Sequence, residues 1–149
     1  VNLRPPWWDS KSVFDAINMA RWVKLNSDEL CDLLEQSLDS KKSLEEGAES
    51  LRRKHGIETV VLTMGEEGAM LVSSDGVVER LVDPVEEIRD TVGAGDAFSA
   101  VCILGFIAGW ALEDTIKRAT AFASEICKIQ GAVSLDKSLY EKYSVAWGF

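Results

Sequence analysis

The stretch from residue 58 to residue 82 most constrains the fold. It begins with "ETVVLTM", an apolar run rich in β-branched residues, which suit a buried strand. Two further runs, "AMLVS" and "VVERLV", follow after the turn segments "GEEG" and "SDG". Asp75-Gly76 is a strong hairpin signal, because both residues tolerate the positive φ angles of a tight two-residue turn. This stretch therefore predicts a central strand followed by a β-hairpin.

Three helices and one short strand are predicted before this stretch. Asp9 or Ser10 can cap the first helix, and "RWVKLN" reads as a strand. The segment "SDELCDLLEQSL" places its four leucines on one helical stripe. A third helix is expected to begin near Ser43, with Glu46 in position for a capping box, and to end at Gly56.

Two more helices are predicted after the hairpin. One runs from about Gly95 to Gly109, and the other from Glu113 or Asp114 to about Ile129. Helices that alternate with strands, then a hairpin, and then more helices are typical of a layered α/β domain. Residues 1–149 contain no internal repeat or linker.

Composition excludes several classes of function. The net charge of −9 argues against nucleic acid or an anionic membrane surface as the partner, because both require a basic face. Three widely spaced cysteines, without a C-x-x-C pair and with a single histidine, disfavour structural zinc. The odd cysteine count favours a reducing, cytoplasmic environment. The longest apolar run, "VCILGFIAGWAL", has about a dozen residues and is too short to cross a bilayer.

The sequence "DTVGAGDAF" predicts an anion-binding turn. Gly93 and Gly95 can adopt backbone angles that let successive amides converge, and the helix that follows adds its unpaired N-terminal N–H groups. Asp96 then places a carboxylate beside the bound anion, where it could accept a proton from a hydroxyl that attacks phosphorus. Asp96 could equally be a helix cap. A dinucleotide fingerprint would need glycine at Phe98, and a Walker A loop is absent.

"DTVGAGDAF" resembles the C-terminal signature of the ribokinase-like, or PfkB, carbohydrate kinases. "KLNSDE" resembles the N-x-x-E element of that family, and "TMGEEGAML" resembles its T-x-G-x-x-G segment. "FASEICKIQGA" is similar to its closing helix and Gly-Ala turn, and "NLRPP" to the fructokinase-like branch. The order and approximate spacing of these motifs agree with those of the family, so the resemblance covers nearly the whole chain.

The resemblance implies a ribokinase-like layered α/β/α fold, with a Rossmann-like sheet and a hairpin extension. Residues 1–149 would be the C-terminal, nucleotide-binding part of a sugar-kinase domain, without the N-terminal sugar-binding half and the lid. The parent reaction would be ATP-dependent phosphorylation of a sugar hydroxyl, with a fructose-like sugar favoured. This part alone would bind nucleotide weakly and turn over little or no sugar. A sheet without its other half leaves an open edge, which predicts a homo-oligomer.

The same resemblance assigns roles to single residues. Asp96 would be the catalytic base, and the amides of Gly93, Ala94 and Gly95 would form the anion hole. Asn26 and Glu29 would position hydrated Mg²⁺ and the phosphates, with no metal bound directly by the protein. The nucleotide-binding residues would be Lys24, Thr63, Gly65, Gly68, Thr120 and Ala123. A site for a monovalent cation, K⁺ in this family, would lie at Asp90 and Val92.

Simpler interpretations of these residues stay open. Asn26 and Glu29 are spaced like a capping box, and the glycines of "TMGEEGAML" could merely close a hairpin. Thr120 stands where relatives often carry Asn or His, which leaves the contact with the purine edge unassigned. For the whole chain, the alternative is a non-catalytic nucleotide-binding or oligomerising remnant of the kinase fold. A hydride-transfer enzyme is a third and more remote interpretation of the chain.

Overall fold

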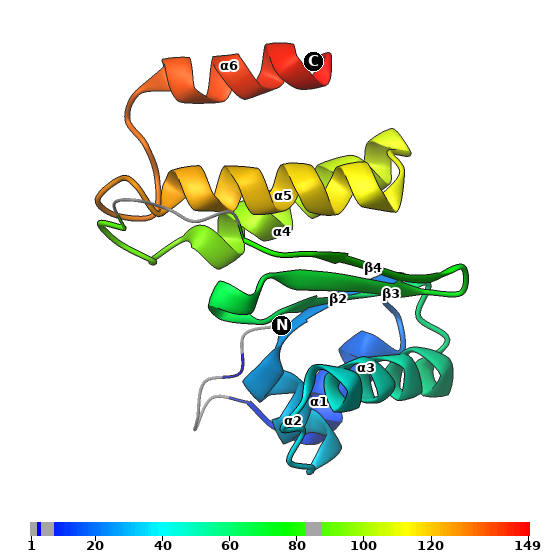
Figure 1. Cartoon of the computed structure of the whole chain (residues 1–149). Coiled ribbons are helices and arrows are strands. Elements are labelled where there is room, and N and C mark those ends of the chain that lie inside the picture. Colours follow the sequence, from blue (N-terminus) through cyan, green and yellow to red (C-terminus); the bar gives the residue numbers. More distant parts are fainter. Residues whose placement is uncertain (1–2, 4–7, 83–87) are drawn as a thin grey trace.

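A four-stranded sheet lies between helices on both of its faces (Figure 1). The computed structural model describes residue 3 and residues 8–82 and 88–149. The "NLRPP" stretch therefore lies outside the described residues, apart from Leu3. None of the helices in the described part of the chain has the length and apolar character needed to cross a membrane.

The sheet has the strand order β1-β2-β3-β4. Its strands are β1 (Trp22–Asn26), β2 (Thr59–Thr63), β3 (Ala69–Ser73) and β4 (Gly76–Arg80). β1 and β2 are parallel, whereas β2, β3 and β4 run antiparallel in succession. β2 and β3 are buried along most of their length, as expected for central strands covered on both faces. The layered α/β fold, the central strand and the hairpin are confirmed.

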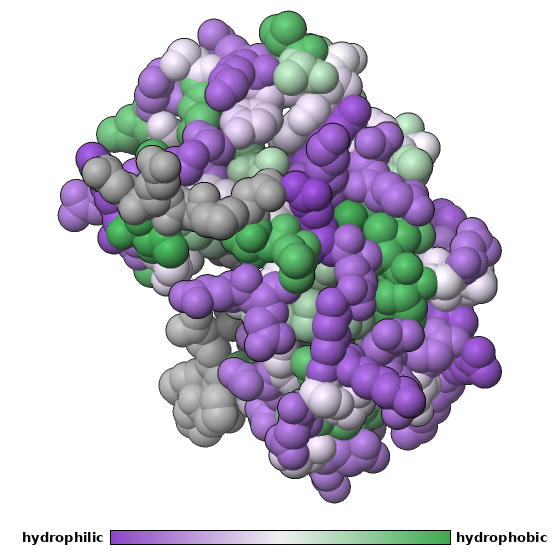
Figure 2. Space-filling view, in the orientation of Figure 1, coloured by the Kyte–Doolittle hydropathy of each residue, from purple (hydrophilic) through white to green (hydrophobic). Residues whose placement is uncertain are grey.

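The lower layer of Figure 1 contains α1 (Ser10–Ile17), α2 (Ser27–Leu34) and α3 (Lys41–His55). The apolar faces of these helices pack with one face of the sheet into a core that includes residues of β1, β2 and β3. Figure 2 shows mainly hydrophilic residues over the lower layer and a band of hydrophobic residues beside the sheet. The three helices predicted before the central strand are present.

Side-chain caps define where two of these helices begin. The Asp9 carboxylate accepts a hydrogen bond from the Ser12 amide at 2.9 Å, so Asp9 is the cap and Ser10, the other candidate, is the first residue of α1. The capping box of α3 is formed by Ser40 and Ser43, and not by Ser43 and Glu46. The prediction was wrong by one turn, because Ser43 can act as the third residue of a box that Ser40 opens.

The upper layer contains α4 (Ala94–Ala108) and α5 (Leu112–Ile126), and α6 (Lys137–Trp147) packs on the outer side of α5 (Figure 1). The sequence did not predict α6. No side-chain cap opens α5, whose N-cap is Ala111, and the helix ends at Ile126 instead of about Ile129.

An aromatic cluster attaches α6 to the domain. Tyr143 and Trp147 meet Phe122 of α5 edge-on, with ring centroids 5.0 and 5.9 Å apart. Edge-to-face ring pairs of this kind stabilise a contact beyond the area they bury. The helix therefore depends on tertiary contacts more than on a strong amphipathic pattern of its own.

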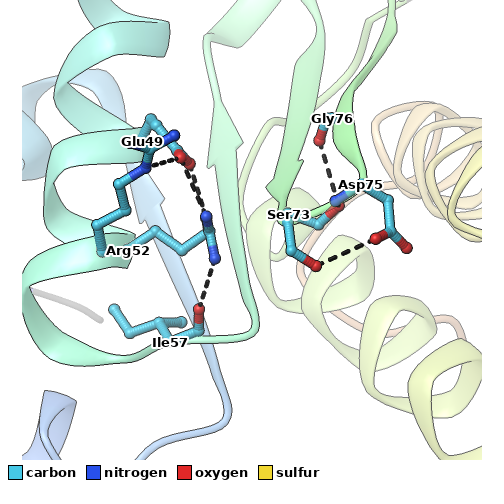
Figure 3. Close-up of polar contacts among 8 residues, drawn as sticks. Glu49, Arg52, Ile57, Ser73, Asp75 and Gly76 are labelled. Carbon is cyan, nitrogen blue, oxygen red and sulfur yellow. Dashed lines mark hydrogen bonds and ion pairs between the residues drawn. The ribbon is translucent and has the colours of Figure 1, made fainter.

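Polar contacts fix the end of α3 and the turn between β3 and β4 (Figure 3). Arg52 donates to the Glu49 carboxylate at 2.6 and 3.0 Å, and to the carbonyl of Ile57 at 3.4 Å. The pKa of Glu49 is lowered to about 2, mainly because of the hydrogen bonds from Arg52. In the turn, the Ser73 hydroxyl donates to the carbonyl of Gly76 at 3.2 Å.

The single histidine, His55, is the last residue of α3. Its Nδ1 lies 2.6 Å from Oδ1 of Asn18, and its ring stacks on Phe14 with centroids 5.1 Å apart. Its Nε2 is buried and has no partner among the described residues. Burial, helped by the nearby Lys54 charge, lowers the pKa of His55.

We predict that stability falls as the pH drops through the ordinary histidine pKa of about 6.5. The unfolded chain then binds a proton that the folded chain resists, so the free energy of unfolding decreases with acidity in this range. Urea unfolding at several pH values between 5.5 and 7.5 measures the effect. His55→Gln should remove most of this slope. An equal slope in both proteins would contradict the prediction.

Candidate active site

Two cavities meet beside the N-terminus of α4. The first, of about 640 Å³, is a cleft between the β2–β3 connection and α5. The second, of about 900 Å³, runs along β1 and α4 and is called the Asp96 cavity here. Lys24, Asn26, Thr91 and Gly95 line both of them. The two cavities therefore adjoin at these four residues.

The two cavities bring together most of the residues singled out from the sequence. Glu29, Val92, Gly93 and Asp96 line the Asp96 cavity. Asp90 lines neither cavity. Residues from four separate segments line the cleft: Lys24, Asn26, Thr63, Gly65, Gly68, Ala94, Gly95, Thr120 and Ala123.

The two glycines of the "DTVGAGDAF" turn have different roles. Gly93 has φ +84°, a backbone angle that disfavours any residue with a side chain. A Cβ at this position would also lie 2.5 Å from Cα of Ala132, which is too close. Gly95 is the second residue of α4 and does not have a positive φ, so the expected special backbone angle was wrong for it. A Cβ at Gly95 would meet the Lys24 ammonium nitrogen at 3.7 Å.

The first turn of α4 presents free amides at the junction of the two cavities. The Ala94 amide donates to the carbonyl of Thr91 at 3.3 Å, so this member of the expected anion hole is engaged within the loop. The amides of Gly95 and Asp96 have no acceptor in the described part of the chain. A helix N-terminus with unpaired N–H groups attracts anions through both hydrogen bonds and the helix dipole.

Asp96 does not cap the helix that it begins. It is the third residue of α4, whose N-cap is Gly93, and no side chain caps the helix. The Asp96 side chain is exposed and lines the Asp96 cavity. The carboxylate is therefore available to a molecule in that cavity, next to the amides that would hold an anion.

Asn26 and Glu29 form a complete capping box at the start of α2. The Asn26 Oδ1 accepts from the Glu29 amide at 2.8 Å, and Glu29 Oε2 accepts from the Asn26 amide at 2.9 Å. Glu29 Oε1 accepts from the Leu3 amide at 3.1 Å. Each carboxylate oxygen keeps a further lone pair, which suits contact with a metal-bound water better than direct ligation. The described residues contain no group of three His, Cys, Asp or Glu side chains placed to hold a metal.

Thr63, Gly65 and Gly68 of the "TMGEEGAML" segment line the cleft, and two of them also have structural roles. The Thr63 hydroxyl donates to the carbonyl of Leu25 at 3.3 Å and so ties β2 to β1. Gly68 has φ +100°, and a Cβ there would lie 2.0 Å from the carbonyl oxygen of Arg80. Gly65 has φ +59°, but a Cβ there would meet nothing within 4 Å. Gly68 therefore has a structural role beside β4, and it also lines the cleft.

Asp90 connects two loops that are distant in sequence. Its Oδ1 accepts from the Val92 amide at 2.9 Å, and its Oδ2 accepts from the Gly131 amide at 3.0 Å. These backbone hydrogen bonds, that from Val92 first, lower the pKa of Asp90. Sequence reasoning assigned Asp90 to a cation site and missed this role. The Asx turn to Val92 could have been expected, but nothing in the spacing indicates the bond to Gly131.

Comparison with known proteins shows the family. A family model described as pfkB family carbohydrate kinase matches residues 1–138. The chain belongs to this family. The 1-phosphofructokinase of Borreliella burgdorferi is 32% identical over 114 residues, which are 72% of this chain and 37% of that protein. The 1-phosphofructokinase of Escherichia coli K12 is 36% identical over 110 residues, which are 72% of this chain and 34% of that protein.

Solved PfkB structures share the fold. A crystal structure of phosphofructokinase-2 from Escherichia coli in complex with potassium superposes with a TM-score of 0.78 at 23% identity. The match covers 93% of this chain and 45% of that one. This chain thus spans little more than a third of the two curated relatives and less than half of the solved structure.

We predict that Gly68→Ala and Gly65→Ala destabilise the chain to different extents. Gly65→Ala should cost about 1 kcal/mol, the strain of a positive φ without a clash. Gly68→Ala should cost about 3 kcal/mol, because its methyl group must also displace the backbone of β4. Urea unfolding of both variants measures the difference. Equal destabilisation would show that contact between Gly68 and β4 does not shape the cleft.

Proposed function

We propose that the protein to which these residues belong transfers phosphate from ATP to a sugar hydroxyl, with residues 1–149 as its C-terminal, nucleotide-binding part. One observation carries the proposal: the unpaired amides of Gly95 and Asp96 and the Asp96 carboxylate lie where the two cavities adjoin. The PfkB family consists of carbohydrate kinases, which supports the reaction class. Relatives named 1-phosphofructokinase support a fructose-like acceptor.

In this proposal the nucleotide occupies the cleft and the sugar enters the Asp96 cavity. The end phosphate of ATP would then lie at the junction, next to the Gly95 and Asp96 amides. The Lys24 ammonium group is close to Gly95 and lines both cavities, so it would add a positive charge beside the phosphate. Pre-formed donors at the position where charge develops are the main source of rate enhancement in phosphoryl transfer.

Asp96 would act as the general base. Its carboxylate would accept the proton of the attacking sugar hydroxyl while the amides of Gly95 and Asp96 donate to the oxygens of the transferring phosphoryl group. A carboxylate beside a phosphate is electrostatically unfavourable, and this role would account for its position. Cys102 and Ile103 line the same cavity and would give the sugar apolar contacts.

Two ions fit the proposal. Mg²⁺ would neutralise phosphate charge when bound, and Asn26 and Glu29 would hold its waters through oxygens that already order α2. K⁺ would lie near Asp90 and Val92, whose loop precedes the anion site. A related phosphofructokinase-2 structure in complex with potassium supports this second ion.

A second candidate is a non-catalytic remnant that binds nucleotide or oligomerises. It is favoured by an open edge of the sheet. Among the described strands β1 has no partner on its outer side. The intact carboxylate at Asp96 favours the enzyme, because a remnant has no use for a base beside an anion site.

We predict that Asp96→Asn in the protein containing both halves of the domain lowers kcat at least about 10²-fold, since a general base contributes on that scale. The KM for ATP should change little, because the amides and the cleft walls stay in place. The matched control is Asp114→Asn, an exposed aspartate of α5 that lines neither cavity. Coupled measurement of ADP release gives both constants. A variant that keeps more than a tenth of kcat would contradict the role of Asp96.

We also propose that this chain self-associates through an apolar face beside β1. On α4, Ile103 and Ile107 are 52% and 73% exposed, and Phe106 contacts Trp22 of β1 with centroids 4.7 Å apart. α4 is apolar almost all round, and a helix of this kind normally has both of its faces covered by other parts of a protein. An exposed apolar stripe next to an open strand edge favours association.

We predict that sedimentation at micromolar concentration gives a mass above that of the monomer. Ile107→Lys should shift the distribution towards monomer, because it places a charge in the apolar contact. Val145→Lys, at an exposed position of α6, is the matched control and should leave the mass unchanged. A monomeric mass for the unaltered chain would disprove the association.

A further inference from the structure

The chain between α5 and α6 is held in place by side chains. Residues 130–136, called the α5–α6 connection here, make no hydrogen bond from backbone to backbone within the described part of the chain. Two side chains outside the connection bind its amides instead. The Gly131 amide donates to the Asp90 carboxylate at 3.0 Å, and the Ser134 amide donates to the Tyr140 hydroxyl at 2.9 Å. The connection is therefore tied at two points, to the loop before α4 by Asp90 and to α6 by Tyr140.

The residue between these two points packs on the turn that begins α4. A Cβ at Gly93 would lie 2.5 Å from Cα, 2.6 Å from Cβ and 2.8 Å from the carbonyl oxygen of Ala132, so the two backbones are in direct contact. Gly93 is the N-cap of α4, and its carbonyl accepts from the Ala97 amide at 2.8 Å. A displacement of Ala132 would therefore change where α4 starts and where the amides of Gly95 and Asp96 point.

Tyr140 is itself fixed by the aromatic cluster that attaches α6. Its ring lies beside Phe122 of α5 with centroids 6.2 Å apart, next to the closer contacts that Tyr143 and Trp147 make with the same ring. Phe122 is buried in the core that α4 and α5 form with one face of the sheet. The hydroxyl that accepts from the α5–α6 connection thus belongs to a side chain anchored on the packed upper layer.

We infer that Tyr140 is a positioning residue for phosphoryl transfer. Its hydroxyl fixes the α5–α6 connection, and Ala132 of this connection holds Gly93 and the first turn of α4 in the orientation that receives the phosphate. The inference rests on the proposed function, which assigns the transferring phosphoryl group to the amides of that turn. Pre-oriented donors need no reorganisation in the transition state, and a small displacement caused by a distant change lowers the rate. Tyr140 lines neither cavity, so its effect on the reaction is indirect.

Tyr140→Phe tests the inference, because it removes the acceptor and keeps the ring beside Phe122. The matched control is Tyr143→Phe, which also removes a hydroxyl from α6 near Phe122, although this hydroxyl has no hydrogen bond to the described residues of the connection. In amide NMR spectra of this chain, the signals of Gly95 and Asp96 should shift in Tyr140→Phe and stay in place in Tyr143→Phe. Unshifted signals in Tyr140→Phe, or equal shifts in both variants, would overturn the inference.

Kinetics of the protein that contains both halves of the domain test the consequence for the reaction. Tyr140→Phe should lower kcat about fivefold, the scale of one lost hydrogen bond, and Tyr143→Phe should not. Thermal unfolding establishes that both variants are folded at the assay temperature. A decrease smaller than twofold, or one no larger than in the control, would overturn the inference and leave the proposed function in place. An unaltered protein without kinase activity would overturn the proposed function, and the NMR spectra would still show whether Tyr140 orients the turn.

Discussion

The hydrogen bonds of the Asp90 carboxylate determine the geometry on which the site depends. They hold the loop of Val92 against the turn at Gly131, while Gly93 packs directly on Ala132. This contact fixes where α4 starts and in which direction its first amides point. Without it, two unpaired amides and a carboxylate would lie on a mobile loop, and an anion would have to order that loop at an entropic cost.

The sheet supplies the other wall of the site. β1 ends at Asn26, where α2 begins, and β2 ends at Thr63, where the segment containing Gly65 and Gly68 turns back into β3. Parallel β1 and β2 bring these two ends to the same edge of the sheet. Ligands of open α/β sheets bind outside the carboxyl ends of the strands. The cleft lies at this edge, and the Asp96 cavity reaches it at Asn26.

Several local features were predictable because they are encoded within a few residues. Asp9 or Ser10 was predicted as a cap, and Asp75-Gly76 as a hairpin turn. The Asn26–Glu29 capping box was the simpler of the two interpretations that the sequence left open. The predicted start of α3 was wrong by one turn, since Ser40, Ser43 and Glu46 offer overlapping capping patterns. α6 was missed because its position depends on aromatic contacts with Phe122, which no local pattern reveals.

The sequence by itself determined the strands, most helices, and the glycine-containing turn that is followed by Asp96 at the start of a helix. These follow from steric preferences and periodicities that act over a few residues. Tertiary structure alone decided that Asp96 faces a cavity and does not cap α4, that Gly68 serves packing, and that Asp90 meets Gly131. These outcomes depend on contacts between residues far apart in the chain, and such contacts exist only after the layers have packed.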